Sequence, residues 1–153
     1  MRTGIGFDAH RFAESRKLML GGVHIEYPLG LEGHSDADVL IHAVMDAVLG
    51  AMGKGDIGAI FPDSSDEYRD ISSMELLRRV GDMTKNRIIN IDSVVICQEP
   101  KIAPYRNSME INIADALSMD PDNVSVKAST TEYMGFTGRK EGIACIATVL
   151  LGE

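Results

Sequence analysis

The sequence predicts an α+β fold, a two-layer sandwich in which helices pack on one face of a mixed β-sheet. Three observations lead to this prediction. Residues 2–10 alternate in the way of a strand, residues 39–51 repeat apolar side chains at helical spacing, and residues 143–151 form a closing apolar strand. Strand and helix patterns follow in the order strand, hairpin, helix, helix, strand, helix, strand, strand. Because no repeat or linker interrupts them, residues 1–153 are predicted to form a single domain.

Composition limits the classes of function. A chain of 153 residues with 44% hydrophobic and 25% charged residues can bury a core without disulfides or a structural metal. Its net charge of −8 argues against nucleic acid as a partner. Nothing resembles a signal peptide, and no apolar run approaches the roughly 18 residues that span a membrane. We therefore expect a cytoplasmic protein with no membrane partner, in which metal ions and backbone amides must help to neutralise any phosphate substrate.

Cys97 and Cys145 are the only cysteines. Each lies within an apolar run, which favours two buried free thiols in a reducing compartment. A disulfide between them is the alternative.

The first strand differs sharply between its two faces. One face carries apolar side chains, namely Ile5, Phe7 and Ala9. The opposite face is bare and then polar, with Gly4, Gly6, Asp8 and His10 in order. The glycines do not open a dinucleotide-binding motif, because no third glycine and no helix follow.

The helix that begins near residue 35 combines a core face with a polar stripe. Ser35 is the expected N-cap, and Asp38 completes an S-x-x-D capping pattern. Asp38, His42 and Asp46 are spaced four apart and form the stripe opposite the apolar face. The helix is expected to end at the glycines that begin at Gly53.

The remaining elements follow from periodicity and turn residues. In chain order we expect a hairpin at 17–26 turning at Gly21-Gly22, a long loop at 55–66, a helix at 71–85 capped by Ser72 or Ser73, a strand at 87–98, a proline-stiffened turn at 99–104, a helix at 105–118, a strand at 124–131 and a glycine-rich loop at 132–142.

Asp8, His10 and His42 are a plausible set of metal ligands. One carboxylate and two imidazoles leave a fourth position open, as in catalytic zinc sites. Asp46 or Asp38 would then hold the free ring nitrogen of His42. The alternative, which spacing alone leaves open, is that all of these are ordinary exposed or hydrogen-bonded polar residues.

Two further stretches suggest phosphate binding. Free N–H groups at the helix start near His34 and Ser35 would attract a phosphate, although Ser35 taken alone is explained as a cap. Residues 129–132, Ser-Thr-Thr-Glu, offer hydroxyls and a carboxylate for a second cation, or form a polar strand end.

Several motifs occur together in a specific order. They are Gly4-x-Gly6-x-Asp8-x-His10-x-Phe12, Gly33-His34-Ser35-Asp36-x-Asp38 with His42, Gly55-Asp56-Ile57-Gly58 with Phe61-Pro62-Asp63, and Thr130-Thr131-Glu132 with Gly135-Phe136-Thr137-Gly138-Arg139. Each is modest alone. Together they make the chain resemble the 2-C-methyl-D-erythritol 2,4-cyclodiphosphate synthase family of the non-mevalonate isoprenoid pathway, over essentially its whole length.

The resemblance implies a homotrimer with active sites between adjacent subunits. The implied substrate is a small cytidine diphosphate ester, 4-diphosphocytidyl-2-C-methyl-D-erythritol 2-phosphate. Its 2-phosphate attacks the β-phosphorus, which gives the cyclic diphosphate and releases CMP. The reaction is metal-assisted and needs no protein nucleophile.

The resemblance also implies roles for particular residues. Zinc falls on Asp8, His10 and His42, and a magnesium or manganese ion on the diphosphate falls on Glu132. His34 and Thr130 match positions that stabilise the transition state. The positions that match the walls of the substrate site are Asp8, His10, His34, Ser35, Asp56, Ile57, Gly58, Phe61, Pro62, Asp63, Ser64, Ser65, Cys97, Pro100, Lys101, Ile102, Ala103, Ser129, Thr130, Thr131, Glu132, Phe136 and Arg139.

Two positions depart from the family's pattern, and two other functions stay open. Glu99 places an acid near the nucleotide, and Ile146 stands where some relatives carry an acid facing the trimer axis, which leaves Arg139 and Glu141 as polar candidates there. The alternatives are a phosphohydrolase on another cytidine diphosphate ester and a non-catalytic metal- or nucleotide-binding module. The acids and glycines of residues 55–65 favour an enzyme, since a binding module does not need them.

Overall fold

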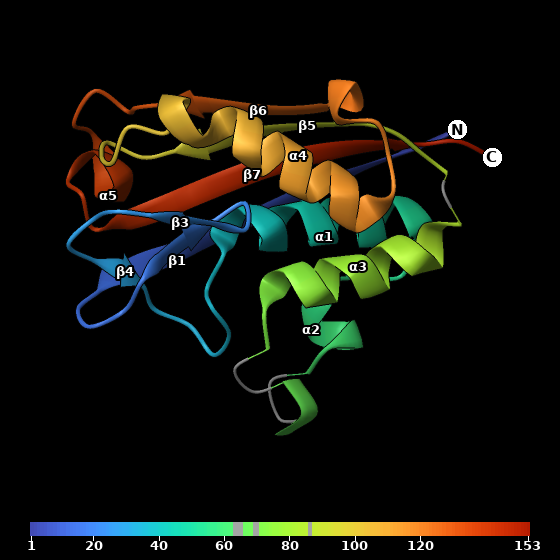
Figure 1. The fold of residues 1–153 in the computed structure, drawn as a ribbon, viewed down its shortest axis with the longest axis horizontal. Helices are drawn as coiled ribbons and strands as arrows, with labels where there is room; N and C mark the ends of the chain where they lie inside the picture. The colour runs from blue at the N-terminus through green and yellow to red at the C-terminus, as the bar shows by residue number, and fades with distance from the viewer. Residues whose placement is uncertain (63–65, 69–70, 86) are drawn as a thin grey trace.

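The elements of the protein lie close to their predicted ranges (Figure 1). The computed structural model describes residues 1–62, 66–68, 71–85 and 87–153. The strands are β1 Arg2–Ala13, β2 Leu18–Leu20, β3 Val23–Ile25, β4 Gly30–Leu31, β5 Ile88–Ile96, β6 Val124–Ser129 and β7 Gly142–Leu151. The helices are α1 Val39–Met52, α2 Ile57–Ile60, α3 Ser73–Thr84, α4 Arg106–Leu117 and α5 Gly135–Gly138, with 3-10 turns at Asp66–Tyr68, Ala103–Tyr105 and Pro121–Asn123.

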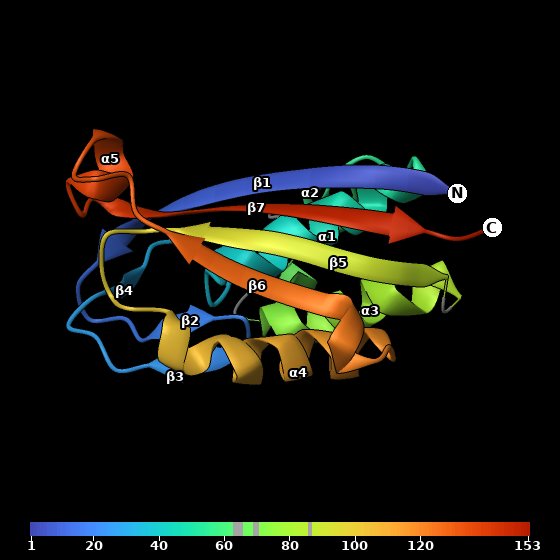
Figure 2. The ribbon, with the colours of Figure 1, turned by 90° about the horizontal axis from the view of Figure 1, so that it is seen from above.

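The chain forms two layers, a sheet and a set of helices. The described strands make a five-stranded sheet with the order β4-β1-β7-β5-β6, while β2 and β3 pair as a separate hairpin. β7 pairs antiparallel with both β1 and β5, and β5 pairs parallel with β6, so the sheet is mixed. α1, α3 and α4 lie on one side of it (Figures 1 and 2). The predicted α+β class with helices on one face is confirmed.

The other face of the sheet is not covered by any helix of the described residues (Figure 2). Ile5 and Phe7 project from β1 on this side, because the residues that alternate with them face α1. Their side chains are 70% and 58% exposed. Exposed large apolar side chains grouped on one surface are typical of protein-protein contacts.

α1 packs unusually close to β1. A Cβ atom at Gly6 would lie 2.0 Å from the carbonyl oxygen of Ala43, and one at Gly4 would lie 1.9 Å from that of Ala47. Only glycine fits at such distances, and the alanines spaced four apart on α1 keep the helix side of the contact equally flat. The close approach places His42 of α1 beside the polar residues that follow Gly6 on β1.

The start of α1 differs from the prediction. Its N-cap is Asp38, whose carboxylate accepts from the N–H of Ile41. Ser35 lies in the preceding turn, where its Oγ accepts from the N–H of Ala37 at 3.2 Å. Ala37 has a positive φ of 55°, which keeps the turn out of the helix. The carboxylate of Asp38 is buried and also accepts from both amides of Gly21-Gly22, so it ties the hairpin turn to the helix.

Other local predictions have mixed outcomes. α1 ends at Gly53 in the left-handed region and α3 has Ser72 as its N-cap, as predicted. α2 and α5 lie in segments predicted to be loops, because a helix of four residues is too short to show helical periodicity. Cys97 and Cys145 are free and buried, as favoured. None of the helices in the described ranges is long and apolar enough to cross a membrane.

Candidate metal centre and substrate cleft

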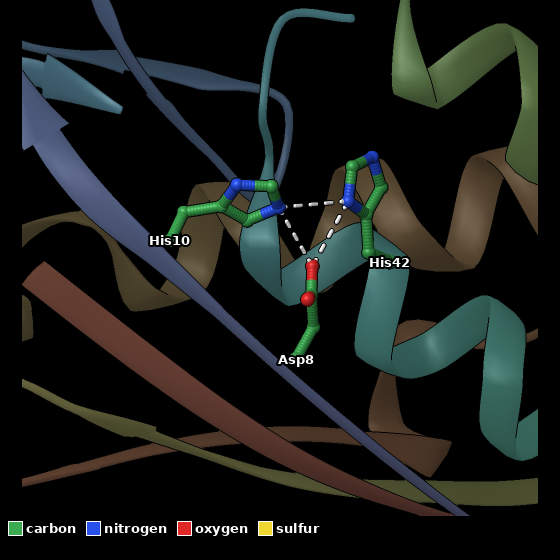
Figure 3. Close-up of side chains that lie close together, drawn as sticks. All are labelled: Asp8, His10 and His42. Atoms are coloured by element: carbon green, nitrogen blue, oxygen red, sulfur yellow. Dashed lines mark hydrogen bonds and ion pairs between the residues drawn. The ribbon is translucent and has the colours of Figure 1, made fainter. Parts of the chain in front are cut away.

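Three side chains from two elements converge on one point (Figure 3). Asp8 and His10 project from the same face of β1, and His42 projects from the first turn of α1. The Oδ2 atom of Asp8 lies 2.9 Å from Nε2 of His10 and 3.0 Å from Nδ1 of His42. The two ring nitrogens lie 3.3 Å apart. The structure thus brings together the three residues predicted as metal ligands.

These separations fit a tetrahedral metal ion. Zinc bonds of about 2.0–2.1 Å at tetrahedral angles hold neighbouring ligand atoms about 3.3 Å apart. The three donor atoms of Asp8, His10 and His42 all lie within 4.8 Å of one another, so small side-chain adjustments would complete the geometry. One carboxylate oxygen and two imidazole nitrogens suit zinc or a similar divalent transition metal.

The hydrogen bonds of His10 fix its tautomer. Its Nδ1 lies 2.6 Å from the carbonyl oxygen of Glu32, which can only accept. Nδ1 therefore carries the proton, and in the neutral ring the lone pair of Nε2 points at the centre. A ligand histidine held in this way is common around protein metal ions.

Asp46 and Asp38 do not hold His42, contrary to the prediction. The carboxylate of Asp46 accepts from the N–H of Ile57, and that of Asp38 accepts from backbone amides. Nε2 of His42 instead lies 3.0 Å from Oγ of Ser73, at the start of α3. The sequence does not predict this partner, because Ser73 and His42 are far apart in the chain and meet only where α3 packs against α1.

Asp8 and His10 also stabilise each other's charged form. Burial alone would raise the pKa of Asp8, but the hydrogen bonds from His10 and His42 and their positive charge lower it well below its usual value. Burial would lower the pKa of His10, but the hydrogen bond and charge of Asp8 together with the Glu32 carbonyl raise it. Asp8 is therefore ionised at neutral pH, and a metal ion would compete with a proton for Nε2 of His10.

A cleft of about 240 Å³ opens above this centre. The predicted site residues that line it are Asp8, His10, His34, Ser35, His42, Ile57, Gly58 and Phe61. Three residues that were not predicted complete it, namely Gly33, Tyr68 and Leu76. The ring of Tyr68 meets that of Phe61 edge-on at 5.3 Å between centroids, which extends the apolar side of the cleft. No spacing rule points to Tyr68, because it lies in a single 3-10 turn.

Arg16 holds the loop that presents His34 to the cleft. Its guanidinium donates to the carbonyl oxygen of Gly33 at 2.7 Å and to that of Ser35 at 2.6 Å. The two bonds bracket His34, and a guanidinium suits such paired contacts because its donors form a rigid fork. Sequence reasoning does not find Arg16, since it lies in the turn after β1 with no motif around it.

A second pocket of about 200 Å³ lies at the ends of β5 and β6. The predicted residues that line it are Cys97, Pro100, Lys101, Ile102, Ala103, Ser129 and Thr130, joined by Gln98 and Ala128. Burial raises the pKa of the Cys97 thiol to about 11, so Cys97 is a neutral wall of this pocket. Among the residues that the structure describes, the two pockets share no lining residue.

The remaining predicted residues lie around these pockets. Asp56 is the N-cap of α2, and Thr131 donates to the carbonyl of Met134. Pro62 and Glu132 are exposed. Phe136 lines a separate hollow beside His10 and Glu141, and Arg139 pairs with Glu141 at 2.7 Å. Asp63, Ser64 and Ser65 lie outside the described residues.

Comparisons with known proteins agree over the whole chain. A model described as the YgbB family matches residues 1–152. The 2-C-methyl-D-erythritol 2,4-cyclodiphosphate synthase of Caldicellulosiruptor bescii is 55% identical over 155 aligned positions, covering 99% of each chain. The synthase of Chlorobaculum parvum is 53% identical, covering 100% of this chain and 99% of its own.

Solved structures share the fold. The Plasmodium falciparum IspF in complex with CDP is 36% identical with a TM-score of 0.85, covering 98% of this chain and 94% of that one. The bifunctional IspDF of Campylobacter jejuni is 46% identical with a TM-score of 0.92, covering 97% of this chain and 41% of that longer one. The chain belongs to the YgbB family.

Proposed function

We propose that this chain is a 2-C-methyl-D-erythritol 2,4-cyclodiphosphate synthase of the non-mevalonate isoprenoid pathway. It converts 4-diphosphocytidyl-2-C-methyl-D-erythritol 2-phosphate to the 2,4-cyclodiphosphate and CMP, as a phosphorus-oxygen lyase. One observation carries the proposal: Asp8, His10 and His42, three residues that could hold a metal ion, line a cleft. The chain in which they lie is 55% identical to an enzyme of that name.

The two pockets divide the substrate between them. We assign the cleft above Asp8 to the methylerythritol and its 2-phosphate, because Ile57 and Phe61 give it an apolar side and His34 and Ser35 a polar one. The pocket between Cys97 and Thr130 takes the cytidine. This agrees with CDP as the ligand named for the Plasmodium falciparum relative. Its Lys101 supplies positive charge in an acidic protein.

Asp8, His10 and His42 would hold zinc, and Glu132 would contact a magnesium or manganese ion on the diphosphate. When bound, these ions neutralise phosphate charge and polarise the phosphorus that is attacked. The three ligands suit this role because Asp8 is ionised and both rings can turn a lone pair to the same point.

The chain's own residues mainly align the reacting groups. Nucleophile and electrophile belong to one molecule, so the protein must hold two phosphates together and let CMP depart. His34, exposed at the cleft and bracketed by the Arg16 contacts, can donate to a phosphate oxygen as charge develops there. Thr130 offers its hydroxyl at the edge of the cytidine pocket.

We further propose a homotrimer in which the cytidine pocket of one subunit adjoins the metal cleft of the next. The open sheet face with Ile5 and Phe7 supports this assembly, because it offers an apolar surface to a partner. The separate lining of the two pockets supports it as well. The arrangement of subunits in the trimer would decide which residues of the cytidine pocket and the metal cleft meet.

Release of CMP tests the proposal. We expect the purified protein to release CMP from the cytidine diphosphate substrate in the presence of magnesium. Replacing His42 with alanine should lower the rate by about 100-fold or more, because one of three metal ligands is lost. His24→Ala is the matched control, since His24 is exposed on the hairpin strand β3 and should keep full activity. Equal rates for the two variants would contradict the assignment of the metal centre.

A further inference from the structure

Ser73 forms a hydrogen-bonded chain that ends on the metal centre. It is the first residue of α3 and its side chain is fully buried. Its Oγ donates to Oδ1 of Asp36 at 2.5 Å, and its backbone N–H donates to Oδ2 of the same carboxylate at 3.2 Å. The same Oγ lies 3.0 Å from Nε2 of His42. The side chain of Ser73 thus stands between a carboxylate and a metal ligand.

The protons of this chain can be assigned from the donor and acceptor capacity of each group. An ionised carboxylate only accepts, so the single proton of the Ser73 hydroxyl is committed to Asp36. The Ser73 oxygen must then accept from His42, which places a proton on Nε2. In the neutral ring this leaves the lone pair of Nδ1 facing Asp8 and His10.

A second hydroxyl near His42, that of Ser35, does not fix the position of the ring proton. Oγ of Ser35 lies 3.3 Å from Nε2 of His42 and already accepts from the N–H of Ala37. No other described residue accepts the Ser35 hydroxyl proton, so Ser35 can donate to or accept from the ring. Of the two hydroxyls near Nε2, that of Ser73, with its proton donated to Asp36, is the one that favours a proton on Nε2.

The competing tautomer would block metal binding. Nδ1 of His42 lies 3.0 Å from Oδ2 of Asp8, so a proton on Nδ1 would be donated to that carboxylate. Asp8 alone therefore favours the tautomer that cannot ligate a metal through Nδ1. The contact with Ser73 acts against this preference from the other side of the ring.

We infer that Ser73, oriented by Asp36, is a positioning residue that keeps Nδ1 of His42 free of a proton and so sets the metal affinity of the centre. The inference rests on the metal site of the proposed function. It extends the site to the start of α3, since neither Ser73 nor Asp36 is among the three candidate ligands or the residues that line the cleft.

Neighbouring serines on α3 allow a matched test. We expect Ser73→Ala to weaken zinc binding to the metal-free protein by about 10- to 100-fold, measured by competition with a chromophoric chelator. Ser72→Ala removes the exposed N-cap of the same helix, whose Oγ accepts from the N–H of Met74. It should lower Tm and leave zinc affinity unchanged. Ser73→Thr restores a hydroxyl and should recover part of the affinity.

A second measurement reads the tautomer without any metal. In ¹⁵N-histidine NMR spectra of the metal-free wild type, we expect His42 in its neutral form to carry its proton on Nε2. Ser73→Ala should move the proton toward Nδ1. A wild type with the proton on Nδ1 would overturn the inference even if the variant failed to fold.

The outcomes also separate this inference from the proposed function. Tight zinc binding that Ser73→Ala leaves unchanged would overturn only the inference. Zinc binding that depends on Ser73, in a protein that releases no CMP, would support the inference and contradict the function. A wild type that binds no zinc would overturn the metal centre and the inference with it.

Discussion

At the scale of single residues, a proton and a cation would compete for the proposed metal centre. Asp8 lies 2.9 Å from Nε2 of His10, the atom that would ligate a metal. The same contact raises the pKa of His10, so a proton is the natural occupant at low pH. Metal binding and folding stability should therefore respond to pH in opposite directions.

We expect zinc affinity to rise with pH until the folded-state pKa of His10 is passed. That pKa lies above the ordinary value of 6.5, and below it each bound ion must displace about one proton, which corresponds to about tenfold in affinity per pH unit. Titration with zinc between pH 6 and pH 9, corrected for the chelator's own protonation, measures this. An affinity independent of pH would contradict the role of His10.

The stability of the metal-free protein should change with pH in the opposite direction to zinc affinity. Since the pKa of His10 is raised on folding, its contribution to stability is complete below about pH 6.5 and is lost as the pH rises through the folded-state value. The Tm of metal-free protein should therefore fall over the same pH range in which zinc affinity rises.

The three candidate ligands could be predicted from the sequence, whereas the residues that hold them and the neighbouring loop in place could not. Asp8 and His10 share a strand face, and His42 stands in the polar stripe of a helix, so both periodicities point to them. Ser73, Asp36 and Arg16 act from the ends of elements and from turns. Their contacts depend on how α3 and the turn after β1 pack in space, which no local pattern encodes.

At the scale of elements, the site depends on how closely α1 approaches β1. The two glycines of β1 allow the helix backbone to contact the strand, and this distance decides whether His42 reaches Asp8. Alternation correctly identified this as the bare face of the strand. The predicted start of α1 was wrong, because an S-x-x-D pattern does not reveal the positive φ of Ala37.

A methyl group at Gly6 should separate the two elements. We expect Gly6→Ala to lower the free energy of unfolding by about 1–3 kcal/mol, because its Cβ would overlap the carbonyl oxygen of Ala43. It should weaken zinc binding as well, since α1 carries His42. Urea unfolding and zinc titration measure the two effects.

Gly50→Ala is the matched control for this substitution. Its Cβ would meet only the carbonyl oxygen of Ile5, at an ordinary 3.9 Å, on the same pair of elements. Alanine is favoured over glycine inside a helix by about 0.5–1 kcal/mol, so stability should be kept or raised. Equal effects of the two substitutions would refute the close-approach explanation.

At the scale of the whole molecule, the sheet keeps one face for the helices and leaves the other open. The order β4-β1-β7-β5-β6 puts the last strand at the centre of the sheet, between segments distant in sequence. Strand patterns predicted the number and type of the long elements but not this order, which depends on long-range pairing. The exposure of Ile5 and Phe7 likewise becomes visible only when the helices are seen to lie on the opposite side.

We expect the open face to mediate self-assembly. The wild type should sediment as a trimer, and Phe7→Glu should shift it toward monomers, because a carboxylate would be buried at an apolar contact. Ile111→Glu is the control, since Ile111 is 40% exposed on α4, on the helical side of the molecule. Analytical ultracentrifugation distinguishes the two. A monomeric wild type, or dissociation by both variants, would contradict this use of the face.

The identity of the second product decides between cyclisation and hydrolysis of the substrate. Phosphorus NMR of the reaction mixture should show CMP together with two coupled phosphorus signals of a cyclic diphosphate. This result is expected because the proposed site holds the 2-phosphate against the β-phosphorus and needs no nucleophile from the protein. CMP together with a linear bisphosphate would contradict the account, because water rather than the substrate's own phosphate would then be the nucleophile.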